Sequence, residues 1–203
     1  MPKPGDSYHH GDLRAACLRA ARELLEEENG SAGLSLRAVA RRAGVSATAP
    51  YRHYADRDAL VSAVAAVGYR ELAAKLAEAH PAPSTPEDLA AVAVAYVRFA
   101  LDHPALFRTM FVEPCDATSE ERVAAVAAIA EYLTENVRRA FPNGDAEALC
   151  TAVWALVHGL AFLHMDGRLD AISPDAVAVN VRSAVSALFA ATATSVSRPS
   201  VEN

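Results

Sequence analysis

The chain has 203 residues, of which 52% are hydrophobic and 6% aromatic, so it can bury a substantial core of mainly Ala, Val and Leu without disulfides. Its net charge of −6 argues against a non-specific architectural DNA-binding protein, because such binding needs broad positive charge. We find no run of eighteen apolar residues without charge and no apolar signal-peptide core in residues 1–12, and therefore expect a cytoplasmic protein without a membrane span.

The cysteines and histidines do not form a recognisable metal or catalytic motif. Cys17, Cys115 and Cys150 are far apart, so we expect neither a disulfide framework nor a zinc site. Small buried hydrophobic side chains are the ordinary interpretation, and a redox-sensing Cys115 is the alternative. The sequence lacks a His-Glu-x-x-His pair, a phosphate-binding glycine loop and a Gly-x-Ser-x-Gly elbow. We therefore expect no cofactor, no metal and no enzyme activity.

Apolar residues recur at helical spacing throughout the chain, and no strand-like alternation of useful length is present. Asp12 and Asn29-Gly30 delimit a first helix, Ser35 and Gly44 a short second one, and Ser46 caps a third. Further helices are expected at about 57–80, 86–102, 104–112, 119–141, 146–167 and 174–194, with a capping box of Thr118 and Glu121 before the helix that ends near 141. The sequence thus predicts an all-α protein of nine helices.

The charge is divided unevenly along the chain. The segment 81–86, Pro-Ala-Pro-Ser-Thr-Pro, breaks the helical pattern and is the best candidate for a domain boundary. Up to residue 60 there are nine Lys/Arg and eight Asp/Glu, whereas the remainder has ten and seventeen. Residues 37–57 contain five arginines and one acidic residue. This cluster is where phosphate contacts would be sought, although such clusters are often only a solvated face.

Residues 36–54 have the layout of a helix-turn-helix: an amphipathic helix, a tight turn at Gly44 and a second helix. A recognition helix reads base edges in the major groove from its N-terminal half. Polar side chains lie on that part of the segment, namely Ser46, Thr48, Tyr51, Arg52 and His53. Val45, Ala49 and Tyr54 can face inward. A generic helical hairpin has a similar pattern.

The sequences Leu36-Arg-Ala-Val-Ala-Arg-Arg-Ala-Gly-Val-Ser46 and Ala-Pro-Tyr-Arg-His-Tyr-Ala-Asp-Arg-Asp-Ala-Leu60 resemble the DNA-binding domain of the tetracycline-repressor (TetR) family. The start Tyr8-His-His-Gly-Asp-Leu-Arg14 is similar to that of many members, and Trp154…His158-Gly159 resembles a signature of one C-terminal subfamily. Tyr54 stands where Phe is usual and Arg57 where Lys is usual. The resemblance implies a DNA-binding domain at 8–56, a connecting helix at 57–80 and a ligand-binding and dimerisation domain at 81–194.

The resemblance also implies roles for single residues. Tyr51 and Arg57 would hold phosphates, and Arg37, Thr48 and Arg52 would contact base edges. The alternatives are that Tyr51 packs in the core and that Arg37 is merely solvated. Arg41 and Arg42 would lie on the outer face and contribute only to the electrostatic field.

In the family the last two long helices pair with those of a second subunit. Here the helices at about 145–167 and 174–194 are apolar enough for that role, and ordinary packing within one chain is the alternative. An effector cavity would lie between central helices, lined by Tyr96, Phe99, Phe107, Met110, Phe111, Trp154, His158 and Phe162. Such an aromatic set, His158 included, is equally typical of a packed core.

We therefore expect a homodimeric repressor that binds a palindromic double-stranded DNA operator and is released by a small apolar or aromatic effector. Effector binding would shift the position of the helix that ends near His80 and tilt the two DNA-binding domains of the dimer apart. A transcriptional activator, or a DNA-binding protein without ligand control, is the alternative. The sequence identifies neither the effector nor the operator.

Overall fold

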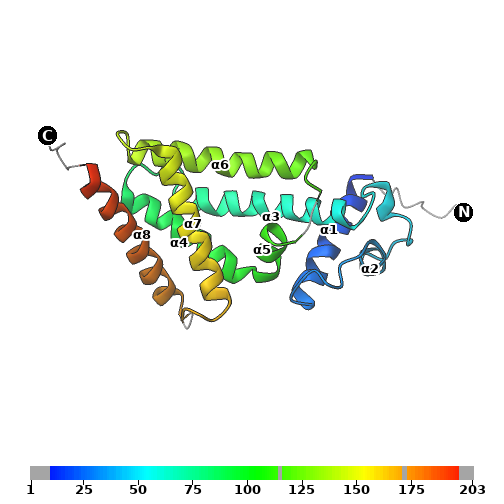
Figure 1. Ribbon diagram of the computed structural model, residues 1–203. Helices are drawn as coiled ribbons and strands as arrows, with labels where there is room; N and C mark the ends of the chain where they lie inside the picture. Colours follow the sequence, from blue (N-terminus) through cyan, green and yellow to red (C-terminus); the bar gives the residue numbers. More distant parts are fainter. Residues whose placement is uncertain (1–9, 114–115, 171–172, 197–203) are drawn as a thin grey trace, which may run out of the picture. The chain divides into compact units, whose positions relative to one another are not determined.

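The computed structural model describes residues 10–113, 116–170 and 173–196, with side chains described from 13 to 191 (Figure 1). This part of the chain contains eight α-helices, one 3-10 helix and no strand: α1 His10–Glu27, α2 Leu36–Arg42, η1 Pro50–Arg52, α3 Arg57–Ala79, α4 Pro86–Asp102, α5 Pro104–Phe111, α6 Glu120–Ala140, α7 Ala146–Met165 and α8 Pro174–Val196. The all-α prediction is confirmed. The third of the nine predicted helices is a single short 3-10 helix instead.

Helix ends follow the capping residues of the sequence. The Ser35 hydroxyl oxygen accepts a hydrogen bond from the Ala38 amide at 3.1 Å at the start of α2. A carboxylate oxygen of Asp145 does the same for the Ala148 amide at 3.0 Å at the start of α7. Each bond satisfies an amide that has no partner within its helix.

Three predicted caps are wrong. Asp12 lies inside α1, and the 3-10 helix begins at Pro50 with Ala49, not Ser46, at its cap position.

The third is the capping box. Thr118 and Glu121 do not form a box, because α6 begins at Glu120. The Thr118 hydroxyl donates to Asp116 at 2.6 Å, and Glu121 forms an ion pair with Arg14, also at 2.6 Å. The pattern indicated a cap, but both side chains have other partners.

The chain is divided into two compact units. The first, the N-terminal unit, comprises the chain up to Tyr69 together with His103–Val126; the second, the C-terminal unit, comprises Arg70–Asp102 together with the chain from Ala127 onward. The division between the two units passes through α3 and α6, and α5 belongs to the same unit as the helix-turn-helix segment. The predicted domains at 8–56 and 81–194 remain a prediction.

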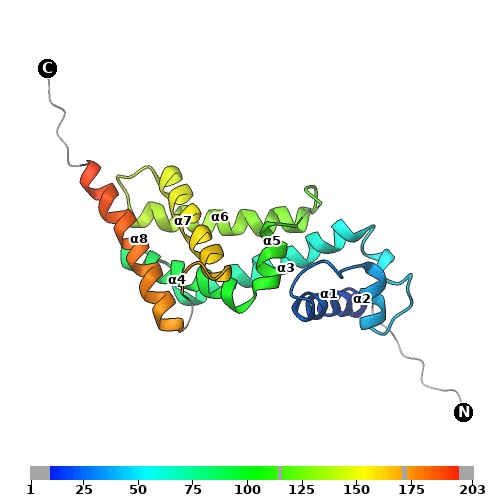
Figure 2. The same cartoon turned by 60° about the horizontal axis from the view of Figure 1, so that its bottom comes forward.

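In the N-terminal unit, α1 packs against α2, η1 and α5 (Figure 2). The helix-turn-helix core is small and mainly apolar, with Leu13, Cys17, Leu34, Val39, Tyr54 and Leu60 each at most 5% exposed. At the other end of the unit, α5 lies close to α3: a Cβ built on Gly68 would be 2.6 Å from the sulfur of Met110. The Tyr69 hydroxyl donates to the Met110 carbonyl oxygen at 2.8 Å.

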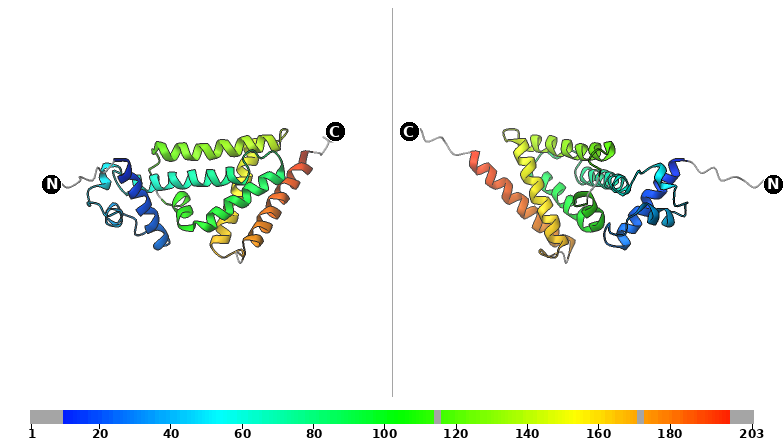
Figure 3. Two further views of the ribbon diagram at one scale, coloured as in Figure 1. Left: turned by 180° about the vertical axis from the view of Figure 1, so that it is seen from behind. Right: turned by 45° about the vertical axis from the view of Figure 1, so that its right-hand side comes forward.

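In the C-terminal unit, α4 packs against both α7 and α8, and these two helices lie side by side (Figure 3). Nine residues of α4 are buried, and the inner faces of α7 and α8 supply Val157, Leu160, Ala161, Val181, Val185 and Phe189. The Tyr132 hydroxyl of α6 donates to the His80 carbonyl oxygen at 2.7 Å, beyond the last residue of α3.

By length and composition, α7 could cross a membrane, with a mean hydropathy of 1.6 over its most apolar window. The pair α4 and α5, bent by 105°, passes the same test. Only 28% of that α7 window is buried within the described chain. Much of the apolar surface of α7 is thus left uncovered by its own chain.

Candidate nucleic-acid interface and ligand cavity

The turn of the helix-turn-helix is built on Gly44. Its φ of +68° lies in the left-handed region, which glycine adopts without the steric cost of a Cβ. The Gly44 amide donates to the Arg41 carbonyl oxygen at 3.3 Å, and the Val45 amide to that of Ala40 at 3.0 Å. These two bonds form a Schellman motif, which ends α2 and directs the chain into the next segment.

The segment from Ser46 to Tyr54 consists of successive tight turns. The amides of Ala49, Arg52 and His53 each donate to the carbonyl oxygen three residues earlier, at 2.9, 3.2 and 2.9 Å. Pro50 has no N–H to donate to the Ser46 carbonyl oxygen four residues back, and its ring disfavours that geometry. A 3-10 helix, Pro50–Arg52, therefore stands where an α-helix was predicted; we call residues 46–54 the recognition segment.

Two inward residues hold this segment on the core. Pro50 is buried, and Tyr54 is 2% exposed. Within the described chain, the Tyr54 hydroxyl has no hydrogen-bond partner, and neither does the buried Nε2 of His53. Burial raises the pKa of Tyr54 to about 12.

Most of the predicted DNA-contacting residues are exposed. Arg37, Ser46, Thr48 and Arg52 are solvent-accessible, and Tyr51 is 51% exposed, so Tyr51 does not pack in the core. In the part of the chain that is described, the guanidinium groups of Arg37 and Arg52 make no hydrogen bond or ion pair. These side chains are available to a partner outside the chain.

The other arginines of the cluster differ from one another. Arg41 is exposed and, among the described residues, unpaired. Arg42 is bound by two carboxylates of α1: it forms an ion pair with Glu23 at 3.3 Å and hydrogen bonds with both oxygens of Glu27. These bonds lower the pKa of Glu27. The Arg42 charge is thus largely neutralised locally, which the sequence pattern did not indicate.

Arg57, predicted to hold phosphate, is engaged within the chain. Its Nε donates to the Leu34 carbonyl oxygen at 3.2 Å, and its Nη2 donates to the carbonyl and hydroxyl oxygens of Ser31, both at 3.1 Å. A Glu113 oxygen lies 3.5 Å from the same Nη2. The side chain is 37% exposed.

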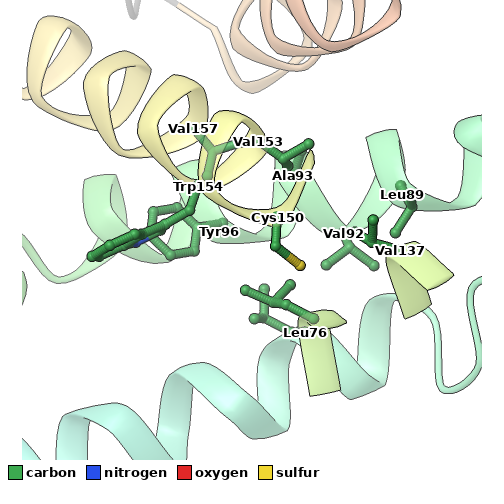
Figure 4. A pocket seen from close by; sticks show the side chains of 11 residues that line it. Leu76, Leu89, Val92, Ala93, Tyr96, Val137, Cys150, Val153, Trp154 and Val157 are labelled. Carbon is green, nitrogen blue, oxygen red and sulfur yellow. The ribbon is translucent and has the colours of Figure 1, made fainter. Parts of the chain in front are cut away.

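The C-terminal unit contains a small cavity of about 30 Å³. Its lining is almost entirely apolar and comes from α3, α4, α6 and α7 (Figure 4), namely Leu76, Leu89, Val92, Ala93, Tyr96, Leu133, Val137, Cys150, Val153, Trp154 and Val157. Trp154, at one end, is 49% exposed. The lining contains no charged side chain, so it suits an uncharged apolar molecule.

The eight predicted effector-binding residues divide into three groups. Four lie together: the Tyr96 hydroxyl is 3.0 Å from Nδ1 of His158, whose ring also contacts those of Trp154 and Phe162. Phe99 is buried on α4 and does not line the cavity.

The remaining three belong to the N-terminal unit, where Phe107 and Met110 are buried. The ring of Phe111 is tilted against that of Phe107 and edge-on to that of Tyr69, at ring-centroid distances of 4.7 and 5.3 Å. The periodicity identified these side chains as apolar helix positions but did not indicate which unit each would enter.

Two family profiles match the sequence. One, described as bacterial regulatory proteins of the tetR family, covers residues 18–64; the other, described as a tetracyclin repressor-like C-terminal domain, covers residues 89–188. The chain belongs to the TetR family.

Individual relatives agree with this assignment. The HTH-type transcriptional regulator Rv1816 of Mycobacterium tuberculosis is 34% identical over 111 residues, which are 52% of this chain and 47% of that protein. The chain thus spans about half the length of the curated relatives it matches. A protein of unknown function from Rhodococcus sp. RHA1 is 35% identical, with a TM-score of 0.75 over 89% of this chain and 97% of that one.

A tetR-family bacterial regulatory protein from Rhodococcus RHA1 shares the fold, with a TM-score of 0.64 at 20% identity over 85% of this chain and 95% of that one. The described chain therefore has the fold of this family, and its helix-turn-helix lies within the residues that the tetR-family profile matches. Cys115, the candidate redox sensor, lies outside the described residues.

The helices that TetR-family resemblance assigns to dimerisation each leave one face uncovered. On α7 four of the exposed residues recur every four positions, at Thr151, Ala155, Gly159 and Leu163, which places them on one stripe. On α8 the exposed set includes the small or apolar residues Val179, Ser183, Ser186, Ala187 and Ala190. The α7 stripe is apolar or small, whereas the exposed face of α8 also carries the polar side chains of Asn180 and Arg182.

Proposed function

We propose that this TetR-family protein is a homodimeric repressor that acts in the cytoplasm on a palindromic operator and is released by a small apolar or aromatic effector. The observation that carries the proposal is the recognition segment: Thr48, Tyr51 and Arg52 are exposed on a short element whose other side is fixed by buried Tyr54. Arg37, exposed and unpaired on α2 among the described residues, adds a fourth candidate contact.

Two copies are needed for a useful operator length. One recognition segment reads only a few base pairs, whereas two related by a two-fold axis read an inverted repeat with centres roughly 34–36 Å apart. The stripe on α7 and the exposed face of α8 supply the contact, because a self-complementary face of mainly small and apolar residues suits a two-fold interface. The 28% burial of the α7 window in one chain leaves area for it.

The cavity of the C-terminal unit is the proposed effector site. Its volume of about 30 Å³ is far below the roughly 300–1,000 Å³ of a typical ligand site, so an effector has to push apart the helices that line it. One of them is α3, which continues from the N-terminal unit into the cavity lining at Leu76. A coupling free energy of roughly 1–3 kcal/mol between the two sites would lower operator affinity about 5–150-fold.

Selection of bound sequences from random duplex DNA tests the proposal directly. We expect an inverted repeat whose half-sites lie about one helical turn apart. A single unrepeated motif would contradict the dimer, and enrichment of no sequence would contradict the operator. Titration of the selected duplex with uncharged aromatic compounds then tests release.

A further inference from the structure

We infer that Arg57 is a positioning residue that ties the two ends of the helix-turn-helix together, and not one of its phosphate ligands. The first residue of α3 reaches back across the motif to the loop before α2, where it bonds Ser31 and Leu34. The inference rests on the DNA binding proposed above, and its structural half is tested without DNA.

The geometry needs a guanidinium. Nε and Nη2 donate in different directions to three acceptors at 3.1–3.2 Å, two of which are backbone carbonyl oxygens. Arginine presents these N–H groups in a fixed planar fork, whereas a lysine ammonium offers one compact charge that cannot span them. Glu113, which follows α5, adds a charged acceptor at 3.5 Å. Three separated pieces of chain thus meet at one side chain.

The recognition segment needs such a tie more than an α-helix would. Between Ser46 and Tyr54 three of the four backbone bonds are tight turns of the 3-10 type, and only the bond from the Tyr54 amide to the Pro50 carbonyl oxygen spans four residues. Bonds of the 3-10 type hold the chain less firmly than α-helical bonds. Arg57 closes the span from residue 31 to residue 57 as a loop and so restricts the conformations open to the segment within it.

The surroundings of Arg57 also disfavour a phosphate. Carboxylate oxygens of Glu113 and Asp58 lie 3.5 and 4.0 Å from its guanidinium nitrogens, so a second anion would be repelled. Arg37 and Arg52 have no such neighbours among the described residues. The local charges therefore distinguish Arg57 from Arg37 and Arg52, the two arginines that we propose contact DNA.

Two substitutions of Arg57 in the full chain separate the roles. If Arg57 bound a phosphate, Arg57→Gln would lower the slope of log affinity against log salt concentration by about 1. Arg57→Lys would then keep both the slope and the affinity of the wild type. A positioning role predicts a different pattern. Both variants should bind the selected duplex roughly 10-fold more weakly, because both lose the guanidinium hydrogen bonds to Ser31 and Leu34. Both should keep the salt slope of the wild type. Arg41→Lys, at an exposed arginine that is unpaired in the described chain, is the matched control and should bind like the wild type.

Hydrogen exchange of the DNA-free protein provides the second readout. In Arg57→Lys we expect amides of residues 31–45 to exchange roughly 10-fold faster than in the wild type, with those of α7 unchanged. A salt slope reduced by about 1 in Arg57→Gln, or wild-type exchange in Arg57→Lys, overturns the inference. If no duplex is selected, the proposed function fails, whereas the hydrogen-exchange result still decides whether Arg57 holds the loop before α2 in place.

Discussion

The Tyr96 hydroxyl and Nδ1 of His158 lie 3.0 Å apart, joining α4 to α7 beside the apolar cavity. Burial lowers the pKa of His158 from its ordinary 6.5, so the imidazole is neutral in the folded protein near neutral pH. The pair is therefore an uncharged hydrogen bond next to an uncharged cavity.

This shift has a consequence for stability at mildly acidic pH. Below pH 6.5 the unfolded chain binds a proton at His158 that the folded chain still excludes, so the free energy of unfolding falls as pH falls through this window. We expect His158→Gln to reduce the acid loss, as measured by urea unfolding between about pH 5 and pH 7.5. Equal pH dependence in both proteins would contradict the role of His158.

Tyr54→Phe should stabilise the protein. It removes a hydroxyl that is buried and, among the described residues, has no partner; such a group costs about 1–3 kcal/mol. Because the folded pKa of Tyr54 is raised to about 12 from 10.0, wild-type stability should also fall as pH rises from 10 to 12, and that fall should shrink in the variant. Tyr69→Phe is the control: its hydroxyl is bonded to Met110, so it should be destabilised.

Arg52→Ala and Thr48→Ala should each relax the preference for particular bases. If Arg52 makes a bidentate contact, its loss should remove about 1–3 kcal/mol of discrimination between bases at the contacted position. Tyr51→Phe should instead weaken binding to all sequences alike, because a lost phosphate contact carries no sequence information. Repeating the selection with each variant checks this. Uniform weakening by Arg52→Ala would show that Arg52 does not read a base.

Ala155→Arg should dissociate the dimer. The residue lies in the exposed stripe of α7, and a central arginine would add a bulky charge at a two-fold contact, facing its own copy. Sedimentation should give a monomer for this variant, whereas Ala128→Arg, equally exposed on α6, should remain a dimer. If both variants remained dimers, the interface would not include the exposed stripe of α7.

Helix limits could be predicted from the sequence because they depend on neighbouring residues. Ser35 and Asp145 cap the helices that follow them, and Pro86 begins α4 as expected. Gly44 adopts the predicted left-handed conformation. The exposure of the recognition segment followed from the same local pattern, since Tyr54 supplies its only large aromatic inward anchor in the described chain.

The features that were missed depend on partners far away in the chain. Arg57 bonds residues 23 and 26 positions before it, and Arg42 bonds carboxylates 15 and 19 positions before it. Spacing along one helix carries no information about such pairs. The prediction of an α-helical recognition element was wrong for a local reason, because Pro50 was taken as tolerable in a first turn although it removes the bond that an α-helix needs there.

Trp154 is the chain's single tryptophan, and it forms one end of the cavity with about half of its surface in water. Indole emission from this protein therefore originates at one location. A compound that displaces water there shifts the emission to shorter wavelength, so occupancy can be followed in the unlabelled protein.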